Sequence, residues 1–65
     1  MQTNFGRNVR RIRRSRELTQ GELASKAGIC KNTVLRIEKS SSDIKFAHAI
    51  AVAKALGTTI DELLK

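Results

Sequence analysis

Tryptophan, tyrosine and proline are absent from this chain, and cysteine occurs only once. A lone cysteine, Cys30, cannot form an internal disulfide, and no Cys/His cluster has the spacing of a zinc site. We therefore expect neither a disulfide, nor a metal, nor any other cofactor to hold the fold together. With only two phenylalanines as aromatic residues, the chain has few side chains on which bases of single-stranded DNA or RNA could stack.

Long apolar runs are also missing. No segment is long and apolar enough for a transmembrane helix, and no apolar stretch follows the N-terminus as it would in a signal peptide. The sequence therefore predicts a cytoplasmic protein without a membrane partner. It has no nucleophile–base pair, metal-ligand set or phosphate loop, so we expect no enzyme activity. Its 65 residues make one domain at most (residues 1–65), without a domain for a small-molecule effector.

Positive charge is in clear excess. Thirteen Lys and Arg residues against six Asp and Glu give a net charge of +7. Six arginines fall within ten positions, namely Arg7, Arg10, Arg11, Arg13, Arg14 and Arg16. Such a density suits a polyanion, because each neutralised phosphate releases condensed counterions. From charge alone, a solvated helix face or an anionic membrane surface are the alternatives. With few aromatic residues for base stacking, the polyanion that remains is double-stranded DNA.

Apolar periodicity predicts an all-α fold of five short helices. The predicted helices cover residues 4–16, a segment that starts at Thr19, residues 31–39, residues 45–56 and a short segment that starts at Thr59. Thr3 or Asn4 can cap the first. Two Thr-x-x-Glu patterns, at residues 19–22 and 59–62, predict capping boxes for the second and the last.

The same pattern predicts the core and the turns. Gly28 and Gly57 stand where the second and fourth helices should end, since glycine accepts a positive φ without steric cost. The fourth helix is expected to turn Phe46, Ala49, Ile50, Ala53 and Leu56 inward. Ile60, Leu63 and Leu64 either complete the core or form part of a dimer surface.

The second and third helices, with Gly28 between them, predict a helix-turn-helix over about residues 19–39. Val34 and Ile37 of the third helix point inward in this arrangement. Its outward face then carries Lys31, Asn32, Leu35 and Arg36. Long polar side chains on such a face can reach the base edges in the major groove, where each base pair shows a distinct pattern.

Two segments, residues 18–29 and 33–38, resemble the helix-turn-helix of the phage repressor and Cro family (XRE-like domains). The resemblance continues upstream through residues 6–13 and downstream through residues 53–57 and 60–64, so it covers nearly the whole chain. It implies a compact, lambda-repressor-like domain, bacterial or phage-encoded. It also implies sequence-specific binding of double-stranded DNA.

The resemblance also assigns roles to residues. Lys31, Asn32 and Arg36 should contact base edges, and Leu35 is either an ordinary exposed residue or a contact to a thymine methyl group. Gln20 should grip a phosphate and brace the recognition helix, and Arg13 on the first helix should pair with Glu38. The full set of expected phosphate contacts is Arg10, Arg14, Thr19, Gln20, Thr33, Lys39, Ser42 and Lys45.

Two positions depart from the family pattern, Leu35 is apolar on a face that should be exposed to water, and two residues remain without a role. Cys30 replaces the usual Ser or Thr cap of the recognition helix, and Ile44 stands where proline is common. Cys30 is otherwise expected to be a small filler near the turn. His48, with no second ligand near it in the sequence, is expected to be a surface or boundary residue.

The predicted function is transcriptional repression by a homodimer on a pseudo-palindromic operator. Two alternatives stay open at this point. One is an antitoxin or adaptor that mainly holds a protein partner through its apolar C-terminus. The other is a basic protein that binds DNA without sequence preference, whose affinity would fall with salt but hardly change with sequence.

Overall fold

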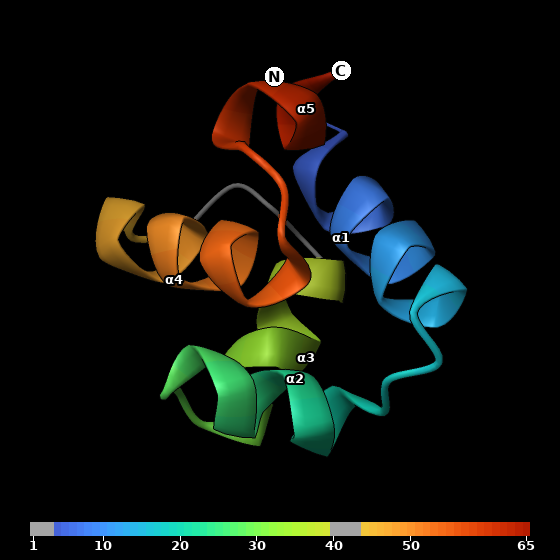
Figure 1. Ribbon diagram of the computed structural model, residues 1–65. Helices are drawn as coiled ribbons and strands as arrows, with labels where there is room; N and C mark the ends of the chain where they lie inside the picture. Colours follow the sequence, from blue (N-terminus) through green and yellow to red (C-terminus); the bar gives the residue numbers. More distant parts are fainter. Residues whose placement is uncertain (1–3, 40–43) are drawn as a thin grey trace.

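The computed structural model describes residues 4–39 and 44–65 (Figure 1). These residues form helices alone: α1 (Phe5–Ser15), α2 (Gln20–Ala27), α3 (Lys31–Lys39), α4 (Phe46–Leu56) and α5 (Ile60–Leu64). The all-α architecture expected from the periodicity is confirmed, and the helix bounds agree with the prediction to within a residue or so. Thr3 and Ser42 lie outside the described residues. In the part of the chain that the structure describes, no helix could cross a membrane.

The helix ends follow from their capping residues. At the start of α2, the Thr19 backbone N–H donates to the Glu22 carboxylate (2.8 Å), and the Glu22 N–H donates to the Thr19 hydroxyl (3.0 Å). The hydrogen bond from the Thr19 backbone N–H is the main cause that lowers the pKa of Glu22 below its ordinary value, and the Thr19 hydroxyl is the second. Gly28 and Gly57 end α2 and α4 with φ of +70°. With both Thr19–Glu22 hydrogen bonds present, the capping box predicted at residues 19–22 is complete.

The other two predicted caps are wrong in part. At α5, the Thr59 hydroxyl accepts from the Glu62 N–H (3.2 Å), but the Glu62 carboxylate pairs with the Lys65 ammonium group (3.1 Å). Only half of this capping box forms. Asn4 occupies the N-cap position of α1, but its side-chain oxygen makes no capping hydrogen bond, and its side-chain NH2 group donates to the Lys65 carbonyl (3.1 Å).

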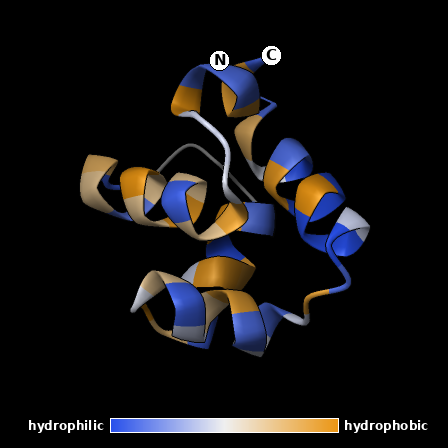
Figure 2. Cartoon of the chain, in the orientation of Figure 1, coloured by the Kyte–Doolittle hydropathy of each residue, from blue (hydrophilic) through white to orange (hydrophobic). Residues whose placement is uncertain are grey.

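The core lies between α1, α2, α3 and α4, and α5 closes one end (Figure 1). Its largest fully buried side chains are Leu23, Leu56, Leu63, Val9, Val34 and Val52. Val52 was not predicted to lie there, whereas Phe46, predicted to point inward, is 71% exposed. Figure 2 shows the reason: α4 is apolar along most of its length, so its sequence does not distinguish the inward side from the outward side.

Leu63 follows the first of the two alternatives stated for the C-terminal helix, completion of the core. It is fully buried and belongs to the core, so it cannot form a dimer surface. The buried Asn8 of α1 holds it there, because the Asn8 amide donates to the Leu63 carbonyl at 2.7 Å. Ile60 packs partly against the core, and Leu64 is 50% exposed. Only these two residues of the three remain available to a partner.

Helices α1 and α3 approach each other closely at Gly6. A Cβ atom at this position would lie 2.1 Å from the Ile37 carbonyl oxygen, far inside van der Waals contact. Only glycine permits this approach, which sets the distance between the arginines of α1 and the exposed face of α3.

Candidate nucleic-acid interface

The four residues predicted to contact bases share one exposed face of α3. Val34 and Ile37 are buried on the opposite side of the helix, which fixes its rotation. Successive residues of an α-helix are about 100° apart, so four positions of the first two turns point away from this buried side. These positions are Lys31, Asn32, Leu35 and Arg36, and all four are exposed.

One cleft lies beside this face, between α3, α1 and the start of α2, and we call it the α1–α3 cleft. It is lined by Arg10, Arg13, Arg14, Thr19, Gln20, Leu35, Glu38 and Lys39. Five of these residues were predicted to contact phosphate. They come from three helices, and the helix-turn-helix together with the close approach at Gly6 brings them to one place.

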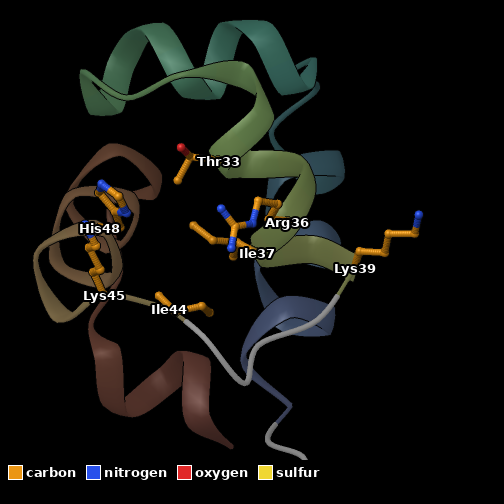
Figure 3. A pocket seen from close by; sticks show the side chains of 7 residues that line it. All are labelled: Thr33, Arg36, Ile37, Lys39, Ile44, Lys45 and His48. Carbon is orange, nitrogen blue, oxygen red and sulfur yellow. The ribbon is translucent and has the colours of Figure 1, made fainter.

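A second cleft separates α3 from the start of α4, and we call it the α3–α4 cleft (Figure 3). Its volume is about 300 Å³, and it is lined by Thr33, Arg36, Ile37, Lys39, Ile44, Lys45 and His48. Thr33, Lys39 and Lys45 were predicted phosphate contacts. In Figure 3, Thr33 and Arg36 of α3 and His48 of α4 lie around the same space, whereas the Lys39 side chain points away.

His48 lines this cleft, although the sequence indicated no function for it. Its position on α4 was clear, but the apolar character of α4 did not indicate which side faces α3. No local pattern in the sequence of α4 therefore indicates that His48 faces the cleft.

The electrostatic balance of both clefts is positive. Glu38 is the only carboxylate that lines either of them among the described residues, and it is already paired. The Arg13 Nε–H donates to Glu38 Oε2 (2.6 Å) and the Arg13 Nη2 group donates to Oε1 (3.2 Å), with both side chains at most 10% exposed. Among residues 4–39 and 44–65, the remaining cations of the clefts are exposed and no acidic side chain pairs with them.

Glu38 also receives a hydrogen bond from the Gln20 side-chain amide (3.2 Å). Arg13 in turn donates to the Leu18 carbonyl (2.7 Å). One carboxylate thus joins α1, the start of α2 and the end of α3. Gln20 braces the recognition helix in this way, as the family resemblance implied.

Cys30, expected to be a small filler near the turn, lies exposed immediately before α3. Its backbone carbonyl accepts from the Thr33 and Val34 amides, at 3.0 and 3.3 Å, and so begins the helix. In the described ranges, no three His, Cys, Asp or Glu residues come together as a metal site would require.

The family of the chain is decided by a family model for helix-turn-helix domains (HTH_3), which matches residues 9–63. The chain belongs to this family. The match spans α2 and α3 with both clefts, so the face described above is the helix-turn-helix of the family. The curated relatives that match are transcriptional regulators rather than enzymes.

One relative of this helix-turn-helix domain is the transcriptional repressor RstR of the cryptic phage CTXphi in Vibrio cholerae. The two are 37% identical over 60 residues, which cover 92% of this chain and 54% of the repressor. The chain thus spans about half the length of that relative.

Solved structures share the fold. The restriction-modification controller protein C.AhdI of Aeromonas hydrophila has a TM-score of 0.86 and 26% identity, with 94% of this chain and 92% of that chain covered. The biofilm regulator SinR, solved in complex with DNA, has a TM-score of 0.85 and 24% identity over 94% of this chain and 98% of its own. The lambda-repressor-like fold expected from the sequence is therefore confirmed.

Proposed function

We propose that this domain binds specific double-stranded DNA sequences with α3 in the major groove. One observation carries the proposal. All seven described residues predicted to contact phosphate line one of the two clefts on either side of the exposed face of α3. The major groove is about 12 Å wide and admits one helix, so phosphates of the two strands flank a helix that lies in it. Helix α3, with a cationic cleft on each side of its exposed face, matches that geometry.

Each exposed residue of α3 then has a defined role. Arg36 donates to guanine O6 and N7, and Asn32 makes paired hydrogen bonds to adenine. Lys31, at the start of the helix, reaches a further guanine, and Leu35 packs against a thymine methyl group. Contacts in the clefts fix the register of the protein on the duplex but carry no sequence information directly.

The finer proposal is repression by a homodimer. Two copies would bind half-sites about 34 Å apart, one helical turn of DNA, and would exclude RNA polymerase from a promoter they cover. We assign the dimer contact to the exposed side chain of Leu64 and the partly exposed side chain of Ile60. The cytoplasm, predicted above, is where such a protein would meet its operator.

The decisive experiment is selection of bound duplexes from a random pool at about 0.15 M salt, followed by sequencing. A motif with two-fold symmetry is the expected result. A single asymmetric half-site would refute the homodimer. Binding without any motif would point to a non-specific basic protein, and no binding at all would favour an interaction module that holds a protein partner.

Substitutions then separate base contacts from phosphate contacts. Arg36→Ala should weaken binding to the selected site by about 1–3 kcal/mol and relax the preference at one position. Lys45→Ala should weaken binding to all sequences alike and reduce the salt dependence. The four cleft cations of each chain that we assign to phosphate, Arg10, Arg14, Lys39 and Lys45, give a slope of log K against log salt of about −7 for a dimer. An equal loss for Arg36→Ala on random DNA would reassign that residue to phosphate.

A further inference from the structure

His48 faces α3 across the α3–α4 cleft, and it is the only histidine of the chain. It is partly buried, and Thr33 and Arg36 lie around the same space in Figure 3. Imidazole is the side chain whose charge ordinarily changes between pH 5 and 8. Its position therefore places a titratable group inside one of the two clefts that we assign to phosphate.

The described residues that line the cleft with His48 are cationic or apolar, apart from the neutral hydroxyl of Thr33. Arg36 and Lys39 line the cleft from α3, and Lys45 lines it from the start of α4. The other helices that pack on α4 bring no described charge into it: Lys26 of α2 lines a groove on another side of α4, and the carboxylates of α5 do not line this cleft. Among the described residues, no acidic side chain in the cleft could serve as a partner for an imidazolium.

The start of α4 adds to the positive character of the cleft. The N-terminal end of a helix carries a partial positive charge, which favours an anion within the first turn. Thr19 and Thr59 cap α2 and α5 with side-chain oxygens, whereas Lys45, at the same position of α4, makes no capping hydrogen bond. His48 lies in this first turn. An anionic oxygen in the cleft would meet the start of α4 and the imidazole of His48 together.

We propose that His48 binds a DNA backbone phosphate as an imidazolium, so that operator binding takes up a proton at this residue. The inference rests on the proposed function. A phosphate oxygen stabilises the protonated ring over the neutral one, so the bound complex holds the proton to a higher pH than the free domain does. The buffer supplies this proton, and a ring nitrogen receives it. Affinity for DNA is then highest at low pH and declines as pH rises through the range in which the complex loses the proton.

The test measures binding to the selected duplex by fluorescence anisotropy from pH 6 to pH 8 at a constant ionic strength of about 0.15 M. The wild-type domain should lose about three- to tenfold in affinity per bound chain across this range. His48→Gln keeps a polar side chain of similar reach without the charge. It should bind with an affinity that hardly changes with pH and matches that of the wild type at pH 8.

Two further variants sharpen the test. His48→Lys places a permanent cation in the cleft and should keep tight binding at pH 8. Lys26→Gln removes a cation from another side of α4 and should leave the pH dependence of the wild type intact. The melting temperature of each variant shows whether a change in affinity arises from binding rather than from loss of the fold.

The outcomes separate this proposal from the proposed function. Affinity that does not change between pH 6 and pH 8, or a pH dependence that persists in His48→Gln, would overturn the role of His48 while leaving DNA binding in place. Failure of the wild-type domain to bind any duplex at either pH would overturn both.

Discussion

The close approach of α1 to α3 at Gly6 gives a sharp prediction for Gly6→Ala. The added Cβ atom would lie 2.1 Å from the Ile37 carbonyl oxygen and 3.3 Å from the Glu38 Cα atom. Both atoms belong to the backbone of α3, so neither can rotate away as a side chain could. Van der Waals separation requires the two helices to move apart by about 1 Å, which disturbs the core on both sides.

Two effects with opposite signs decide the result. Alanine has a higher helix propensity than glycine, which favours the variant by about 1 kcal/mol. Overpacking of a well-packed core costs about 1–3 kcal/mol, and more where the backbone must move. We expect a net loss of about 2 kcal/mol in the free energy of unfolding, equivalent to roughly 10 °C in Tm for a domain of this size.

Gly21→Ala is the matched control. Gly21 also lies inside a helix, but a Cβ atom there would meet only the Thr19 hydroxyl oxygen, at 3.9 Å. This variant keeps the gain in propensity without the clash and should stabilise the domain by about 0.5–1 kcal/mol. Urea unfolding of the three proteins measures both effects. If Gly6→Ala proved as stable as Gly21→Ala, the close packing of α1 on α3 would be refuted.

Three other predictions concern stability. Glu38→Ala strands the buried Arg13 and should cost about 3–5 kcal/mol, most of the stability of so small a domain; an unchanged Tm would mean that the pair contributes little. Because the pKa of Glu22 is lowered in the folded domain, its carboxylate should stabilise the fold above about pH 4.3, and this stabilisation should be lost as pH falls further. Acid titration of the Glu22→Gln variant should not show this loss. Leu63→Ala should cost about 2–5 kcal/mol and Leu64→Ala less than about 0.5 kcal/mol by thermal unfolding, and equal effects would contradict the different burial of the two residues.

Local patterns in the sequence were sufficient to predict the helices. The Thr19–Glu22 capping box and Gly28 act within one turn of chain, so their geometry is encoded by neighbours in the sequence. Alternation of buried and exposed residues along α3 was equally clear, because Val34 and Ile37 are its only strongly apolar inward positions. The exposed face of α3 followed directly from that pattern.

Features that depend on contacts between helices were not predictable in the same way. The sequence of α4 is apolar on nearly every side, so neither the exposure of Phe46 nor the cleft position of His48 could be read from it. Asn8 shows no sign of burial in the sequence, since its hydrogen bond to the Leu63 carbonyl spans 55 positions of the chain. The need for glycine at position 6 likewise arises from the Ile37 carbonyl on another helix, so it could not be predicted from neighbouring residues.

The hydrogen bond from the Asn4 amide to the Lys65 carbonyl brings α5 beside the start of α1. Together with the Asn8 contact, it closes a series of packed helices in which α1 contacts α3, α3 contacts α2, α2 contacts α4, α4 contacts α5, and α5 contacts α1 again. A circular permutant that joins these ends through a short linker and opens the chain beside Gly57, in an exposed turn, would preserve the existing contacts between helices. The arrangement of the helices in this closed series, rather than the point at which the chain starts, is what positions α3.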